Sequence, residues 1–235
     1  MLKKIGCFII LLCCIMSAGC SNYFAPKGKT IYNISWIDFI QFNDIKYYSS
    51  MDSNGLKLTK DDLDKELYKV KFNVVDNVQE PGYKIKNGDA AFLPVNTEVY
   101  SVKGYSNNFC LAAYNSRREL VVYFADVNPK AKKGEDLLDI KDKVESISIN
   151  SEMDGKELAS ITDEKLIGKM VDMILQASVD TKQRNSSKRF FIEFHLKRGI
   201  SFKRCYFIDA GELGRGIMLP KEFTEIIQKA VAGKE

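Results

Sequence analysis

The sequence predicts an α+β fold, with a β-rich N-terminal part followed by a C-terminal βαββα unit whose helices cover a mostly antiparallel sheet. Two observations predict this class. Short apolar runs that alternate with polar residues, cut by frequent turn residues, fill residues 30–127 and are typical of antiparallel strands. In residues 144–235, two stretches with apolar residues at helical spacing accompany three further strand-like runs.

The N-terminal part opens with a predicted β-hairpin at residues 34–42 and 45–48, because two aromatic-rich runs flank Asn43-Asp44, and both turn residues tolerate a positive φ. Thr59 and the acidic residues after it are typical of a helix N-terminus, and we expect a short helix that ends near Leu67. The next runs predict strands at residues 68–75, 90–93, 97–102, 109–114 and 120–125.

Residues 128–143 break this pattern. The segment is charged and contains Pro129 and Gly134, so we interpret it as a connecting segment between a β-rich domain at 30–127 and an α+β domain at 144–235. Its apolar residues Leu137, Leu138 and Ile140 predict that it packs against the folded protein and is not a free linker.

The C-terminal part has clearer signals. Residues 144–149 alternate as a strand, and Arg198-Gly199 separates two runs, 189–196 and 200–208, that predict a hairpin. Thr162 and Pro220 begin the two predicted helices, and Gly233 ends the second. The apolar stripes of these helices consist of Leu166, Ile167, Met170, Val171, Ile174 and Leu175, and of Phe223, Ile226, Ile227, Ala230 and Val231.

Residues 1–19 have the three parts of an export signal, which are a basic start, an uncharged apolar run and an exit of small residues. The apolar run from Ile5 to Met16 is about 18 Å long as a helix, whereas a membrane core is about 30 Å thick, so the run is too short for an ordinary span. Ser17-Ala18-Gly19-Cys20 resembles the lipobox of bacterial lipoproteins. That resemblance implies a diacylglyceryl group on Cys20, cleavage just before it, and a tether at residues 20–29.

The cysteines agree with this interpretation. Three of the six lie in the signal and Cys20 is the lipidation site, which leaves Cys110 and Cys205 in the folded part. Two cysteines so far apart in apolar, strand-like contexts do not form the framework of a disulfide-stapled domain. We interpret them as buried thiols, and a disulfide between them is the alternative.

Charge and composition exclude some classes of protein. The formal net charge of +4 falls to about +2 once Lys3 and Lys4 leave with the signal, and this balance does not indicate a nucleic-acid-binding protein. The hydrophobic content of 45% is typical of a folded domain and not of a disordered stalk.

The sequence contains no recognisable catalytic constellation. His195 is the single histidine, so a multi-histidine metal site is impossible, and we predict neither a metal nor a cofactor. Strand alternation predicts that His195 shares a polar face with Glu193. A serine–lysine or carboxylate mechanism stays open, although no spacing supports one.

One glycine-rich segment precedes the last helix. Residues 211–216 lack the G-x-G-x-x-G spacing and the strand-to-helix context of a dinucleotide site. The plain interpretation is a loop that needs positive φ values. The functional interpretation is that Arg215, held between Gly214 and Gly216, binds an anionic group or the carboxylate of a partner.

Five segments resemble an uncharacterised family of lipoproteins from low-GC Gram-positive bacteria. They are Trp36-Ile37-Asp38-Phe39, Asn87-Gly88-Asp89-Ala90-Ala91-Phe92-Leu93, Val102-Lys103-Gly104-Tyr105, Leu137-Leu138-Asp139-Ile140 and Gly214-Arg215-Gly216-Ile217-Met218-Leu219-Pro220. The resemblance spans the mature chain and implies no biochemical activity.

We therefore expect a lipoprotein anchored on the outer face of the cytoplasmic membrane, acting as a non-catalytic binding or interaction module of the cell envelope. Its partner would be an envelope protein, a wall polymer or a small ligand, besides the membrane that its lipid enters. The alternative is a small envelope hydrolase that uses carboxylates. A solute-binding component of a transporter is disfavoured, because two α/β lobes around a cleft need more chain than the 216 residues left after cleavage.

Overall fold

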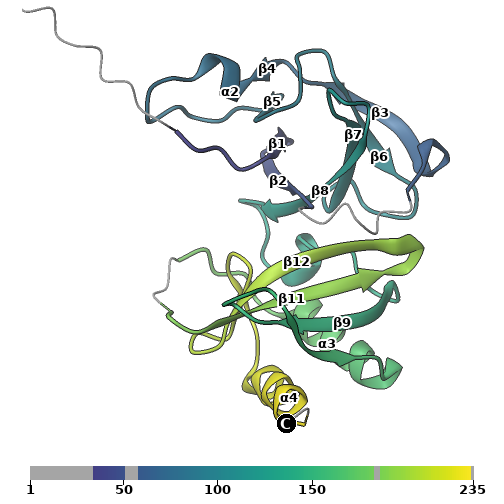
Figure 1. Cartoon of the computed structure of the whole chain (residues 1–235), viewed down its shortest axis with the longest axis vertical. Helices are drawn as coiled ribbons and strands as arrows, with labels where there is room; N and C mark the ends of the chain where they lie inside the picture. The colour runs from purple at the N-terminus through teal and green to yellow at the C-terminus, as the bar shows by residue number, and fades with distance from the viewer. Residues whose placement is uncertain (1–33, 51–57, 183–185, 234–235) are drawn as a thin grey trace, which may run out of the picture. The chain divides into compact units, whose positions relative to one another are not determined.

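The computed structural model describes residues 34–50, 58–182 and 186–233. These residues contain fourteen strands in two sheets together with α-helices, which confirms the predicted α+β class (Figure 1). Both sheets belong to one compact unit, residues 34–235. In the part of the chain that the structure describes, no helix has the length and apolar character needed to cross a membrane.

The first sheet has eight strands in the order β3-β6-β7-β8-β2-β1-β5-β4. Neighbouring strands are antiparallel, except for the short parallel pair β4 and β5. The strands are β1 (Phe39–Phe42), β2 (Ile45–Ser49), β3 (Leu63–Lys69), β4 (Phe72–Asn73), β5 (Asp89–Ala90), β6 (Glu98–Val102), β7 (Cys110–Tyr114) and β8 (Leu120–Val127).

The predicted first hairpin is confirmed. In β1 and β2, Phe42 pairs with Ile45, and the two turn residues between them have positive φ values, 49° at Asn43 and 65° at Asp44. The backbone N–H of Asp44 also donates to the side-chain oxygen of Asn87, which ties the turn to a neighbouring loop.

The helix predicted from Thr59 to Leu67 is wrong. The cap forms, since the backbone N–H of Thr59 donates to the Asp62 carboxylate over 2.9 Å, but it closes only a 3-10 turn, η2 (Lys60–Asp62). Leu63 then pairs with Val102 of β6 and is buried, so the chain continues as β3. Pairing in the sheet outweighs the local helix signal.

The strand predicted at residues 68–75 has the wrong bounds. β3 ends at Lys69, and after the two residues of β4 the chain turns into α2 (Val74–Asn77). The side-chain oxygen of Asn73 accepts the backbone N–H of Asp76 and so caps this helix, a local hydrogen bond that ends the strand. The strand predicted at 90–93 is also shorter, because β5 consists of Asp89–Ala90 alone.

The second sheet has six antiparallel strands in the order β10-β9-β11-β12-β13-β14. The sequence analysis missed β10, because only Ala159 and Ile161 of this strand are buried apolar residues. With β10 included, the order of the main elements is ββαββα and not the predicted βαββα. The predicted hairpin is β11 and β12, joined through η4 (Lys197–Gly199). The strands are β9 (Val144–Asn150), β10 (Glu157–Ile161), β11 (Arg189–Leu196), β12 (Ile200–Phe207), β13 (Glu212–Leu213) and β14 (Ile217–Met218).

Two amphipathic helices pack against this sheet, as predicted. In α3 (Glu164–Gln176), which contacts β9, the Asp163 carboxylate caps the first turn by accepting the Leu166 N–H over 2.7 Å. In α4 (Lys221–Ala232), which contacts β10, the ring of Phe223 packs edge-on against Tyr206 of β12. Figure 1 shows both helices beside the strands of this sheet.

Side chains from both sheets enter one apolar core. Phe202 of β12 contacts the rings of Phe109, Phe124 and Phe194, at centroid distances of 5.0 to 5.4 Å. The division into domains 30–127 and 144–235 stays a prediction.

The connecting segment 128–143 packs down as predicted, and Leu137, Leu138 and Ile140 are buried. Gly134, at the start of η3 (Gly134–Asp136), lies directly against the end of α3, where its N–H donates to the carbonyl of Ala177.

Two glycine-to-alanine variants test this contact. In Gly134→Ala the new Cβ would lie 1.9 Å from the Ile174 carbonyl oxygen, so we expect a loss of about 1–3 kcal/mol of unfolding free energy. Gly168 is exposed within α3 and has open space around it, so Gly168→Ala should gain about 0.5–1 kcal/mol. Urea denaturation of both variants measures the difference, and equal stabilities would contradict the packing of the connecting segment.

Candidate functional site

A cavity of about 980 Å³ is lined by residues of β2 and β8 from the first sheet and of β11 and β12 from the second. Its wall combines aromatic rings with a charged cluster. The wall includes Tyr48, Phe124, Asp126, Phe202, Arg204 and Arg215.

Arg204 is the most buried of these charges, with 11% of its side chain exposed. Its guanidinium donates to the carbonyl oxygens of Ala125 and Lys203 and lies 5.0 Å from the Phe202 ring centroid. Burial lowers the pKa of Arg204, and the Asp126 carboxylate opposes that shift. The guanidinium therefore joins the two sheets through backbone carbonyls and one carboxylate.

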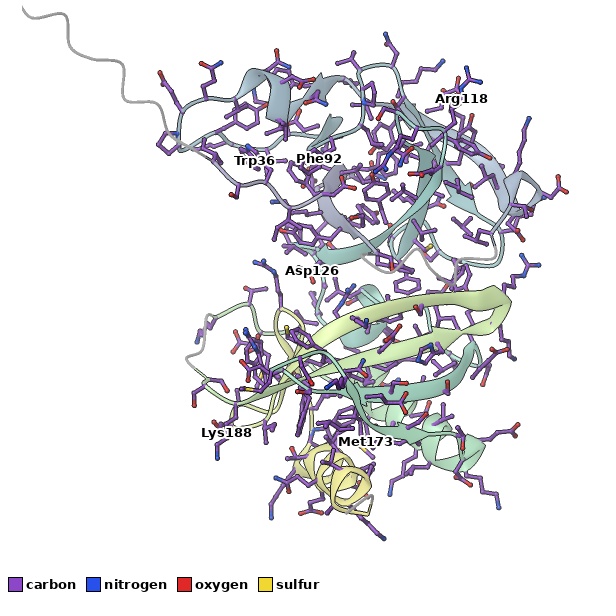
Figure 2. The ribbon with its side chains drawn as sticks, viewed as in Figure 1. Trp36, Phe92, Arg118, Asp126, Met173 and Lys188 are labelled. Carbon is purple, nitrogen blue, oxygen red and sulfur yellow. The ribbon has the colours of Figure 1, made fainter. Side chains whose placement is uncertain are left out.

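Asp126, near the end of β8, lies between two arginines and is labelled in Figure 2. One carboxylate oxygen is 3.9 Å from Nε of Arg204, and the other is 2.7 Å from Nε of Arg215. Asp126 is 12% exposed, whereas the Arg215 side chain is 61% exposed. Arg215 thus reaches from an exposed loop to a nearly buried carboxylate.

Glycines shape the loop that carries Arg215. Gly214 and Gly216 have φ values of 64° and 105°, which confirms the predicted need for positive φ in this segment. A Cβ at Gly214 would lie 3.2 Å from Cδ of Arg204, and a Cβ at Gly216 would lie 2.5 Å from the carbonyl oxygen of Asp180. The loop therefore packs against both the Arg204 stem and the strand-like segment before residue 181.

Two cations lie near the ring of Tyr48 in β2. The Arg215 guanidinium carbon and the Lys46 Nζ both lie 5.9 Å from the centroid of its ring. Nζ of Lys46 is also 4.9 Å from the centroid of Phe39. Burial lowers the pKa of Lys46, the positive charge of Arg215 lowers it further, and Asp126 raises it. Arg204 and Arg215 therefore share the Asp126 carboxylate, whose charge also acts on Lys46.

The sequence-predicted residues fall into two groups. Arg215 lies in the wall of the cavity, next to Asp126 and Arg204. The lipidation site Cys20, the signal at 1–19 and the tether at 20–29 lie outside the described residues.

His195 lies on the polar face of the second sheet, half-buried. Its Nε2 is 2.9 Å from the Ser148 hydroxyl, and that hydroxyl also lies within 2.8 Å of a Glu157 carboxylate oxygen. In a catalytic triad the histidine stands between serine and acid, whereas here the serine stands between the other two. This arrangement is a hydrogen-bonded chain across β11, β9 and β10, and it does not activate the serine.

The two cysteines of the folded part do not pair in the described residues. Cys110 is fully buried in β7, and Cys205 of β12 is partly buried and lines the cavity. Burial raises the pKa of the Cys205 thiol. Cys205 is therefore the thiol through which cavity occupancy can be followed.

The sequence analysis missed Arg204, Asp126 and Lys46. A signal for Arg204 is present in β12, where Ile200, Phe202 and Tyr206 alternate on one face and Arg204 occupies the same face. A charge at an inward position of an apolar strand face indicates a buried partner. Asp126 and Lys46 carry no comparable signal, because each is an ordinary polar residue near the end of its strand.

No family model, curated protein or solved structure matches this chain. The resemblance to lipoproteins of low-GC Gram-positive bacteria therefore stays a prediction.

Two substitutions compare the stability contributed by the buried Asp126–Arg204 pair with that contributed by the exposed Arg215. Asp126→Asn removes the carboxylate that balances buried Arg204, so we expect a loss of about 1–3 kcal/mol of unfolding free energy. Arg215→Gln removes a largely exposed partner and should cost less than about 1 kcal/mol. Chemical denaturation measures both changes in unfolding free energy. A larger loss for Arg215→Gln than for Asp126→Asn would contradict this assignment, because the exposed arginine would then contribute more stability than the buried pair.

Proposed function

We propose that this protein is a lipid-anchored, extracytoplasmic binding module, and that the cavity beside Asp126, Arg204 and Arg215 takes a small ligand. The export signal and the lipobox-like Ser17-Ala18-Gly19-Cys20 support the anchor. A diacylglyceryl cysteine carries two acyl chains, which hold a protein stably on a bilayer, whereas one chain holds it only marginally.

The observation that carries the binding proposal is the cavity itself. A volume of about 980 Å³ lies at the upper end of the range typical of small-molecule sites. Aromatic residues such as Phe191 and Phe207 supply apolar wall, and the charged cluster supplies a few placed polar groups. Ligand sites combine these two features, since apolar surface gives affinity and polar groups give orientation.

Binding without catalysis is favoured over hydrolysis by the arrangement of polar groups. In the group Glu157–Ser148–His195 the histidine does not lie between the serine and the acid, as it does in a catalytic triad. Asp126 is engaged by two arginines, which suits a structural and electrostatic role.

The anchor is tested with Cys20→Ser. The variant should escape lipidation and cleavage at residue 20, and its mass should differ from that of the wild type. Mass spectrometry of the wild-type N-terminal peptide should show a diacylglyceryl adduct on Cys20. A wild-type protein that is released into the medium with an unmodified N-terminus elsewhere would contradict the anchor.

The binding site is tested through Cys205. In the mature chain with Cys20→Ser, the remaining thiols are Cys205 and fully buried Cys110, so maleimide at about pH 8.5 should label Cys205. Compounds that raise the melting temperature in a screen of envelope metabolites should slow this labelling. Cys205→Ser is the control and should remove the fast labelling phase.

Stabilising compounds that leave Cys205 labelling unchanged would place binding outside the cavity and contradict the proposal. Turnover of a bound ester or peptide would favour the hydrolase instead.

A further inference from the structure

We infer that the ligand of this cavity carries an anionic group that binds between Lys46 and Arg215, alongside the ring of Tyr48. The anion would be a carboxylate or a phosphate joined to an apolar or aromatic body. This inference rests on the proposed function, because it names the ligand chemistry of the same cavity.

Two cations lie near the Tyr48 ring: Tyr48 and Arg215 line the cavity, and Lys46 adjoins Tyr48 two residues earlier on β2. Nζ of Lys46 and the guanidinium carbon of Arg215 are each 5.9 Å from the Tyr48 centroid. The two residues come from different sheets and different parts of the chain, β2 and the loop before β14. An anion beside this ring would receive hydrogen bonds from an ammonium and a guanidinium together.

The local charges do not balance. Near Tyr48, Lys46, Arg204 and Arg215 carry three positive charges, and Asp126 is the carboxylate that pairs with the two arginines in the described residues. Elsewhere in the cavity wall, the acids Glu193 and Glu212 accompany Lys182 and Lys203, and Glu193 pairs with Lys203. Within those residues, no carboxylate lies at ion-pair distance from Lys46, and rings of Phe39 and Tyr48 are its neighbours. Like charges that are held together in a partly buried place cost free energy, which an incoming anion would recover.

Arg215 has donors available for such an anion. Asp126 engages its Nε, and no other ion pair involves its side chain in the described part of the chain. With 61% of that side chain exposed, its terminal nitrogens can bond a ligand while Nε stays on Asp126. Arg204 differs, because both of its terminal nitrogens already donate to backbone carbonyls.

The rest of the ligand faces aromatic wall. Ile37, Phe191 and Phe207 line the cavity, where Ile37 is 55% exposed and the two phenylalanine rings are only partly buried. Bulky apolar groups beside these rings would be removed from water, at about 25 cal/mol per Å² of buried apolar surface. A purely polar anion would leave this wall in contact with water, so the ligand is amphipathic.

Two dyes test the inference on the mature chain with Cys20→Ser. The probe is 8-anilino-1-naphthalenesulfonate, an anion on an aromatic body, and the matched neutral probe is N-phenyl-1-naphthylamine, which lacks the sulfonate. Both should protect Cys205 from maleimide. Lys46→Gln and Arg215→Gln should each raise the dissociation constant of the anionic dye about tenfold and leave that of the neutral dye within about twofold.

Lys221→Gln is the matched control, since it removes the same charge from a residue of α4 that is 90% exposed and pairs with Glu225, outside the group around Tyr48. It should leave both dissociation constants unchanged. Asp126→Asn removes the competing carboxylate and should tighten the anionic dye, provided that circular dichroism shows a folded variant. Phenyl phosphate and phenylacetate, used as competitors, then distinguish a phosphate from a carboxylate ligand.

The outcomes separate the two proposals. If both dyes protect Cys205 but Lys46→Gln and Arg215→Gln bind the anionic dye as tightly as the parent chain, the anion subsite is wrong and the cavity remains a binding site. If neither dye protects Cys205, the cavity is not a binding site and the proposed function fails with it.

Discussion

The burial of the Arg204 guanidinium between the two sheets is the constraint on which the cavity depends. A charge with so little exposure must be balanced and hydrogen-bonded, and the chain meets this need with Asp126 and with backbone carbonyls of Ala125 and Lys203. Residue 214 is a glycine with a positive φ of 64°, and a Cβ there would come within 3.2 Å of the Arg204 stem. The loop therefore passes close to Asp126, and that passage brings Arg215 to the same carboxylate.

Much of the fold could be predicted from periodicity. The alternation in β11 and β12 and the stripes of α3 and α4 gave their positions, because each element buries one face and exposes the other. The failures lie where local and long-range interactions compete. Thr59 does cap a turn, yet pairing with β6 converts the expected helix into β3, and a sequence does not reveal which distant strand will compete.

The candidate site was predictable only in part. Arg215 stands out because glycines flank it, and its loop has the positive φ values that they indicate. Arg204 also leaves a trace, as a charge on the apolar face of β12. Lys46 and Asp126 leave none, since their importance comes from pairing between β2 and β8 and from contact with another sheet. Only the three-dimensional structure shows that residues so far apart in sequence lie close together.

The hydrogen bonds around the Arg215 loop have a kinetic consequence. The N–H of Gly214 donates to the Cys205 carbonyl, the N–H of Asp180 donates to the Gly216 carbonyl, and the N–H of Met218 donates to that of Ser178. The backbone is thus held on both sides, while the exposed Arg215 side chain reorients within picoseconds to nanoseconds whenever its contact with Asp126 opens. Ligand entry would then need no movement of the loop backbone. The association rate would depend on diffusion and charge, and differences in affinity would come from the dissociation rate.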